Sequence, residues 1–120
     1  MTALINAYIG KPYKYGARGP DAFDCWGLVL ALRAALGLPV PPDFSTRTMA
    51  VLEQRRLMFA ALAPARLVDA RHGAIAYSER HAHAGVFVHG RVVHAAYRAG
   101  VVAWPLGRWS AMFDDSRFYP

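Results

Sequence analysis

The chain has 120 residues, a formal net charge of +6, a hydrophobic fraction of 55% and a single cysteine. This length predicts one domain over residues 1–120, and the high apolar content excludes a disordered chain. The lone cysteine excludes an intramolecular disulfide, and no apolar run reaches the roughly 18 residues of a membrane-spanning helix. The basic residues are scattered, without a dense tract or a nucleic-acid-binding motif, so nucleic acid is not expected as a partner.

The N-terminal third predicts two helices separated by a loop. A short helix is expected over Thr2–Ile9, followed by a loop over Lys11–Phe23 that is rich in glycine, proline and aromatic residues. The next helix is expected over Cys25–Leu36, with Asp24 as its N-cap and Gly37 as the residue that ends it. This helix is apolar nearly all round, which predicts that it is buried.

The middle of the chain predicts an extended linker and one more helix. Three prolines over residues 39–42 disfavour helix there. A second helical pattern runs over Ser45–Ala63 and is closed by Pro64. The side chains expected to face a core are Leu52, Leu57, Met58 and Leu62.

From Arg66 onward the hydrophobic period changes to two, which indicates strands. The expected strands are Gly73–Tyr77, Ala82–Val88, Arg91–Tyr97, Val101–Pro105 and a last edge strand at Arg117–Tyr119. His89-Gly90 is typical of a tight hairpin turn, a second turn is expected over Tyr97–Gly100, and a short helical turn over Trp109–Phe113. Helices followed by antiparallel strands predict an α+β domain, with the N-terminal helices packed on a sheet of about five strands.

Cys25 is the sharpest chemical signal, because a lone thiol stands at the first turn of a predicted helix. The thiolate is the nucleophilic form of cysteine, and the partial positive charge of a helix N-terminus favours it. The unpaired N–H groups there could also stabilise an oxyanion. The alternative is an inert core thiol, since free cysteines are among the most buried residues.

Strand parity selects two of the five histidines as partners for this thiol. If the hairpin turns at His89-Gly90, Gly85 faces His94, and His83 and His94 share one face as diagonal neighbours. His83 could then act as a base while His94 orients its ring. The remaining histidines, His72, His81 and His89, are expected to be solvated or to cap local structure. The spacing shows no paired ligand motif, so neither a metal site nor a cofactor is expected.

These motifs together resemble the NlpC family of papain-like cell-wall cysteine peptidases. KPYKYGARGPDAFDCWGLV carries the Pro-Tyr segment, the Gly-rich loop and the Asp-Cys-x-Gly step of that family. HAGVFVHGRVVHAA carries its His-x-Gly strand and a third polar residue about a dozen positions later. The resemblance covers nearly the whole chain, with the motifs in the family's order, and implies the papain-like (NlpC-type) fold.

The resemblance implies roles for individual residues. Cys25 matches the nucleophile, His83 the general base and His94 the orienting residue. Tyr13 matches a tyrosine whose hydroxyl lies near the nucleophile; the alternative is an aromatic residue that only packs in the loop. Asp24 matches the acidic residue before the nucleophile, which caps the helix and contacts a substrate amine; the alternative is that Asp24 only caps the helix. Trp26 is expected in the core. The chain departs from the family at His72-Gly73-Ala74, where Gly-Asp is common, and at Ala17-Arg18-Gly19, where a second glycine often follows.

The function implied is hydrolysis of amide bonds in peptidoglycan stem peptides. The tryptophan after the cysteine resembles versions found in tail-tip proteins of tailed bacteriophages, which implies other tail-tip proteins as partners. The expected location is then the virion, or the host envelope after delivery; MTALINAYIG lacks the basic start of a signal peptide. Alternatives are a non-catalytic assembly module of a tail tip and an acyltransferase with the same Cys–His chemistry. The net charge reflects either a solvated basic surface or an anionic partner.

Overall fold

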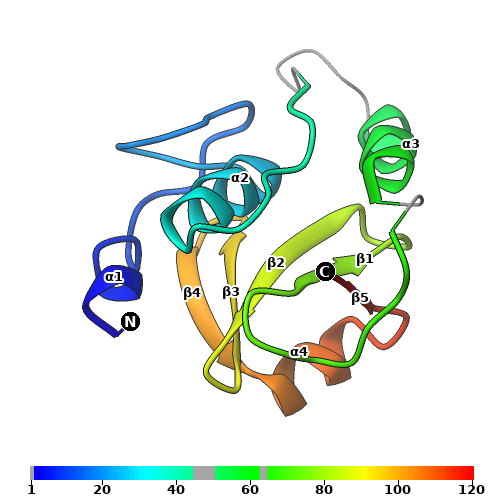
Figure 1. The fold of residues 1–120 in the computed structure, drawn as a ribbon. Coiled ribbons are helices and arrows are strands. Elements are labelled where there is room, and N and C mark those ends of the chain that lie inside the picture. Colours follow the sequence, from blue (N-terminus) through cyan, green and yellow to red (C-terminus); the bar gives the residue numbers. More distant parts are fainter. Residues whose placement is uncertain (1, 45–50, 63–64) are drawn as a thin grey trace.

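The computed structural model describes residues 2–44, 51–62 and 65–120. Within these ranges, four helices and five strands follow one another in the order α1 Thr2–Asn6, α2 Cys25–Ala35, α3 Val51–Leu62, β1 Ile75–Ser78, β2 His83–Val88, β3 Arg91–Ala96, β4 Gly100–Pro105, α4 Leu106–Met112 and β5 Arg117–Tyr119. The strands form one antiparallel sheet in the order β4-β3-β2-β1-β5. Figure 1 shows α2 lying across this sheet, with α3 near β1 and α4 following β4. The predicted α+β class, with helices on a five-stranded sheet, is confirmed.

The sheet separates two clusters of buried side chains. Val86 and Val88 of β2 pack with α2 in the larger cluster. Phe87, between them, packs with Trp109 of α4 in the smaller cluster. Because successive side chains of a strand point to opposite faces, α2 and α4 cover opposite faces of the sheet. The helix that carries Cys25 therefore approaches the sheet from one side, and α4 approaches it from the other.

Helix α2 begins and ends as its sequence predicts. The Asp24 side chain accepts a hydrogen bond from Gly27 N, and Gly37 takes up a left-handed φ of +72° after the C-cap. Arg33 interrupts the apolar pattern but is only 4% exposed. Its guanidinium donates to the carbonyls of Pro39 and Gly73, at 2.9 and 2.7 Å, so it anchors both the linker and the segment that leads into β1.

Trp26 occupies the core, as predicted. It is 1% exposed, its ring stacks on Phe44, and its Nε1 donates to the Pro42 carbonyl at 3.0 Å. The prolines of the linker therefore place a carbonyl where the indole N–H of α2 needs an acceptor.

Several element boundaries differ from the predictions for tertiary reasons. Helix α1 ends at Asn6 rather than Ile9, because the chain then turns so that Gly10 N can donate to Val101 O of β4. Strand β1 starts at Ile75 rather than Gly73, which is in a turn at φ +84°. In α3, Met58 and Leu62 are buried as predicted, but Leu57 is 37% exposed, so its prediction is wrong. Leu52's side chain and residues 45–50, 63 and 64 lie outside what the structure describes.

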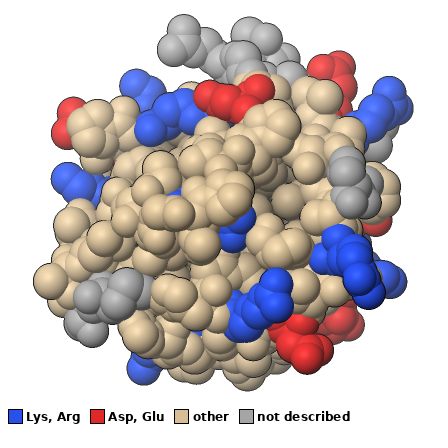
Figure 2. Space-filling view, in the orientation of Figure 1, with Lys and Arg blue, Asp and Glu red and all other residues tan. Residues whose placement is uncertain are grey.

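The β2–β3 hairpin follows the predicted register. His89 and Gly90 both have positive φ, which suits a two-residue turn, and Val88 pairs with Arg91. In the part of the chain that the structure describes, no helix is long and apolar enough to cross a membrane. Figure 2 shows Lys and Arg spread around the molecular face in view, without a continuous basic patch.

Candidate active site

The loop before α2 is fastened to the helix that carries Cys25. The two oxygens of Asp24 accept hydrogen bonds from Gly27 N at 2.7 Å, from Arg18 Nη1 at 2.8 Å and from Gly16 N at 3.2 Å. Asp24 N in turn donates to Ala17 O at 3.1 Å. The structure thus shows that Asp24 is the N-cap and organises the loop; its contact with a substrate amine stays a prediction.

Gly27 explains the glycine of the Asp-Cys-Trp-Gly step. A Cβ at this position would lie 2.2 Å from Ala17 O and 3.2 Å from Arg18 Cα. The loop backbone therefore rests directly on the first turn of α2, and a side chain at residue 27 would displace it. This contact holds the loop beside the thiol.

The Cys25 thiol is buried against the start of β2. The residue is 8% exposed, and Sγ lies 3.9 Å from Ala82 O. Burial, and secondarily the Asp24 charge, raise the pKa of Cys25 to about 12, while the N–H groups of Ala84 and Trp26 act in the opposite direction. The thiolate expected from the helix N-terminus is therefore not the resting form, because loss of hydration outweighs the N–H groups.

The structure brings His83 and His94 together. His83 Nε2 and His94 Nδ1 are 2.8 Å apart, with the rings nearly perpendicular. Gly85 leaves the room this requires, since a Cβ there would lie 3.0 Å from His94 Cβ and 2.8 Å from Val93 O. Burial is the largest cause that lowers the pKa of His83 to about 3 and that of His94 to about 4. Both imidazoles are therefore neutral at pH 7.

The backbone of β2 joins the thiol to this histidine pair. The groups that contact Sγ belong to Ala82 and Ala84, which flank His83 on both sides. The other ring nitrogen of His83, Nδ1, does not take part in the bond to His94. An approach of Sγ to a His83 ring nitrogen within about 4 Å, the loose geometry expected without substrate, stays a prediction.

Tyr13 lies in the electrostatic reach of the thiol. Its pKa is raised to about 12, first by burial and then by the charges of Cys25 and Asp24. Its ring packs edge-to-face on Tyr97 at 5.6 Å. The Lys11–Phe23 loop is also tied to the sheet, because Val101 N donates to Lys11 O at 2.9 Å. These contacts hold Tyr13 within electrostatic reach of Cys25; a contact between its hydroxyl and a substrate stays a prediction.

The remaining histidines stand apart from this pair. His72 and His89 are exposed and pack against each other at 5.4 Å. His81 is bonded to Ser78 Oγ at 3.0 Å, and that hydroxyl donates to Asp115 Oδ1 at 2.7 Å. These contacts agree with the solvated or capping roles predicted for them. Among the described residues, no group of three His, Cys, Asp or Glu side chains could hold a metal ion.

Three aromatic side chains enclose the histidine pair, and the sequence pattern did not connect them with it. Trp109 stacks on the His83 ring at 5.7 Å and meets His94 at 5.0 Å; Phe113 lies 5.0 Å from His83; Trp104 lies 4.5 Å from His94. The spacing of Trp109 and Phe113 by four residues in a helical segment was the one available signal, because such residues share a helix face.

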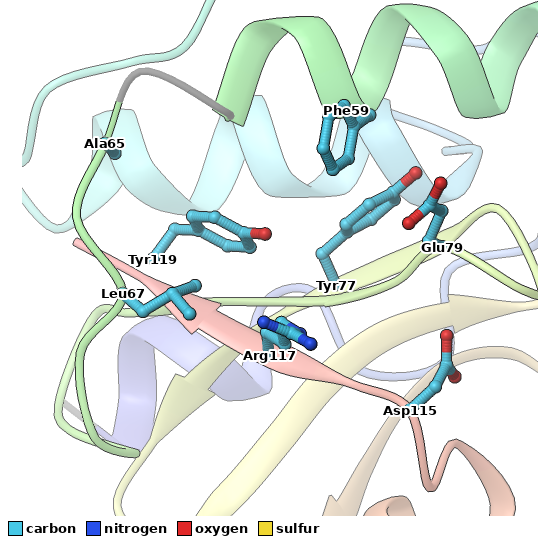
Figure 3. Close-up of a pocket in the computed structure, with 8 residues that line it drawn as sticks. All are labelled: Phe59, Ala65, Leu67, Tyr77, Glu79, Asp115, Arg117 and Tyr119. Carbon is cyan, nitrogen blue, oxygen red and sulfur yellow. The ribbon is translucent and has the colours of Figure 1, made fainter.

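A cavity of about 460 Å³ is lined in part by Glu79, in the turn that precedes β2. Ala82 N donates to Glu79 O at 3.2 Å, so one short turn carries both Glu79, which lines the cavity, and the carbonyl next to Sγ. Figure 3 shows Phe59 entering from α3, and Tyr77 and Tyr119 from the sheet. The other lining residues are Ala65, Leu67, Asp115 and Arg117. Its volume and mixed lining suit part of a peptide ligand.

Comparison with known proteins gives a consistent result. A model of the NlpC/P60 family matches residues 10–108. A protein of Corynebacterium glutamicum named "Probable endopeptidase" is 33% identical over 98 residues, which are 78% of this chain and 42% of that protein. "Probable endopeptidase p60" of Listeria grayi is 36% identical over 47 residues, 39% of this chain and 9% of that protein. The chain thus spans about two fifths of the length of the Corynebacterium glutamicum protein.

Solved structures show the same fold at low identity. NlpC1 of Trichomonas vaginalis superposes with a TM-score of 0.60 and 20% identity, over 98% of this chain and 41% of that chain. A lipoprotein-like NLP/P60 family protein of Staphylococcus aureus superposes with a TM-score of 0.58 and 19% identity, over 97% and 39% of the two chains. The predicted papain-like NlpC fold is confirmed by these neighbours.

Proposed function

Because the chain belongs to the NlpC/P60 family, we propose that it is a cysteine peptidase or amidase that hydrolyses amide bonds of peptidoglycan stem peptides. The observation that carries this proposal is the thiol of Cys25, which lies against the backbone on both sides of His83. The His83 ring is held in turn by His94 at 2.8 Å. This arrangement supports Cys25 as the nucleophile, His83 as the base and His94 as the group that orients the base.

The chemistry starts from a neutral site. The Cys25 sulfur attacks the amide carbon while its proton passes to His83. The C–S bond forms as the S–H bond breaks, the carbonyl π electrons move to oxygen, and His83 becomes an imidazolium. The N–H groups at the start of α2 stabilise the developing oxyanion, because the first N–H groups of a helix lack acceptors within it. His83 then gives its proton to the leaving nitrogen as the C–N bond breaks. Water, deprotonated by His83, hydrolyses the thioester and restores the thiol.

Two further side chains support this path in the proposal. The Tyr13 hydroxyl, within electrostatic reach of Cys25, donates to the oxyanion or to the substrate. Asp24 acts chiefly through the loop, because its carboxylate already accepts three hydrogen bonds from Gly16, Arg18 and Gly27. The cavity at Glu79 offers room for a substrate residue away from the cleaved bond.

The test uses purified peptidoglycan and mass spectrometry of the released fragments. The wild-type chain should produce stem-peptide fragments with one new amine and one new carboxylate for each bond cleaved. Cys25→Ala and His83→Gln should abolish release, whereas His72→Gln, at an exposed histidine, should retain it. Release that persists in Cys25→Ala would refute the nucleophile. Products acylated on an amine instead of hydrolysed would indicate an acyltransferase.

We further propose that the domain works at the tip of a bacteriophage tail, together with other tail-tip proteins, and opens the wall locally as DNA enters. The support is the Cys25-Trp26 step, which resembles the tail-tip versions of the family. Protein mass spectrometry of purified particles that encode this chain should detect it in the virion. Its absence from the particles would contradict this setting, and its presence without hydrolysis would favour a structural assembly module.

A further inference from the structure

One nitrogen of the histidine pair is left without a polar contact. His94 is 1% exposed, and its Nε2 is buried without a hydrogen-bond partner among the described residues. The other nitrogen, Nδ1, is 2.8 Å from His83 Nε2. All polar contact of the His94 ring within the described structure therefore passes through His83.

An aromatic enclosure, formed by Trp104, Trp109 and Phe113, surrounds the ring. The planes of Trp104 and Phe113 are 21° apart, and His94 stands at 78° to the first and 86° to the second. Trp109 meets His94 at 73°. Trp109 and Phe113 also lie at 29° and 34° to the ring of His83. The enclosure thus restrains the orientation of both imidazoles.

The enclosure also fixes the charge of His94. Burial, and secondarily the charge of Arg108, lower the pKa of His94 to about 4. The guanidinium of Arg108 is held close by, over the Trp104 ring at 4.1 Å from its centroid. The titratable neighbour on the sheet side is His83, which is itself neutral at pH 7. A neutral imidazole carries one N–H and one lone pair, so the remaining question is which nitrogen holds the hydrogen.

The two tautomers differ in what they leave inside the enclosure. If His94 donates from Nδ1, a lone pair at Nε2 is buried among aromatic rings whose faces are electron-rich. If His94 is protonated at Nε2, the buried group is an N–H instead, for which aromatic faces are weak acceptors. In this second case His94 Nδ1 accepts a hydrogen bond from His83 Nε2–H. The one hydrogen of the neutral His83 ring is therefore on its Nε2. His83 Nδ1 then carries the free lone pair.

We propose that Trp104, Trp109 and Phe113 hold His94 as the Nε2-protonated tautomer, and so reserve His83 Nδ1 as the proton acceptor for Cys25. The three aromatics are positioning residues, since they act through the imidazoles. His94 cannot pass a proton onward within the described structure, because no acceptor faces its Nε2. It therefore stays a neutral acceptor while His83 carries the charge. The catalytic consequence rests on the proposed function, whereas the tautomer does not.

The tautomer is measured directly on the ¹⁵N-histidine-labelled protein. Long-range ¹H–¹⁵N correlation spectra at pH 7, with His94→Gln used for assignment, should show His94 protonated at Nε2 and unprotonated at Nδ1. His83 should show the same tautomer. A His94 protonated at Nδ1, or an imidazolium at pH 7, would overturn the proposal.

A pair of matched variants tests the enclosure. Phe113→Leu opens it, whereas Phe118→Leu removes the same atoms from a half-buried phenylalanine that packs on Phe87 instead. In Phe113→Leu the His94 signal should move toward the other tautomer or titrate nearer its ordinary value. The acid limb of kcat should shift to higher pH, with kcat at pH 6 reduced by up to about fourfold and KM little changed. Phe118→Leu should leave both readouts as in the wild type.

The outcomes separate this inference from the proposed function. The predicted tautomer in a chain that hydrolyses no peptidoglycan would refute the peptidase proposal and leave the enclosure standing. Cys25-dependent hydrolysis with the opposite His94 tautomer would refute the enclosure alone. Equal pH profiles in the two variants would show that Phe113 only packs, and would overturn its positioning role.

Discussion

Gly27→Ala gives the sharpest test of how the loop and helix hold Cys25. The new Cβ would lie 2.2 Å from Ala17 O and 3.1 Å from Asp24 Oδ1. The first distance is more than about 1 Å inside an optimal contact, so the loop must move away from α2. Overpacking of this kind costs about 1–3 kcal/mol, and the displaced hydrogen bond from Asp24 N to Ala17 O about 1 kcal/mol more. The better helix propensity of alanine returns about 1 kcal/mol.

The expected result is a net loss of about 1–3 kcal/mol in the free energy of unfolding, which for a domain of this size lowers Tm by roughly 5–10 °C. Hydrolysis should fall as well, because the loop carries Tyr13. Gly107→Ala is the matched control, since that glycine is in α4 and a Cβ added there would meet no neighbouring atom within 4 Å. It should be neutral or stabilise by up to about 1 kcal/mol. Equal effects of the two substitutions on urea unfolding would refute the reasoning.

Four further predictions follow from the site. Because the pKa values of His83 and His94 lie below the ordinary 6.5, the unfolded state binds more protons than the folded state below that pH. The free energy of unfolding should therefore be highest above pH 6.5 and lower by about 2 kcal/mol per histidine at pH 5. In His94→Gln, urea unfolding should show about half of this loss. Native Cys25, with its raised pKa, should react with iodoacetamide more slowly than a free thiol at pH 7; faster reaction at pH 6 would indicate a preformed thiolate. Tyr13→Phe should lower kcat roughly 10- to 100-fold while Tyr15→Phe does not, and equal activities would exclude an oxyanion role for its hydroxyl. Glu79→Gln should raise KM and Glu53→Gln should not; an unchanged KM would exclude the cavity from substrate binding.

The helix ends and the hairpin register could be predicted because local chemistry determines them. Asp24 and Gly37 are a cap and a left-handed terminus, and both work through backbone groups a few residues away. The two-residue turn at His89-Gly90 fixes which residues of β2 and β3 share a face, and with it the pairing of His83 with His94. The family motifs then identified the fold, which the solved neighbours confirm.

What escaped prediction depends on contacts between distant segments. The pKa of the thiol is decided by its burial against the turn before β2, not by the helix terminus alone. The enclosure brings Trp104, at the end of β4, against side chains in and after α4. The alternation of apolar residues along a strand does not show which face of the sheet α4 covers. The exposure of Leu57 likewise follows from how α3 packs against the larger cluster through Met58 and Leu62.

The neutral resting site has a consequence for how the proposed reaction is controlled. Burial disfavours the thiolate of Cys25 and the imidazolium of His83 together, so an ion pair between them gains little before substrate arrives. Once an amide carbonyl lies at the N-terminus of α2, negative charge can form on its oxygen among N–H donors rather than on sulfur alone. The proton then leaves the thiol as the C–S bond forms. The same burial that should slow the reaction of the thiol with small electrophiles strengthens interactions with that oxyanion, because the local dielectric is low. Reactivity is thereby reserved for a ligand that fits the helix end, a selectivity that suits the proposed peptidoglycan hydrolase.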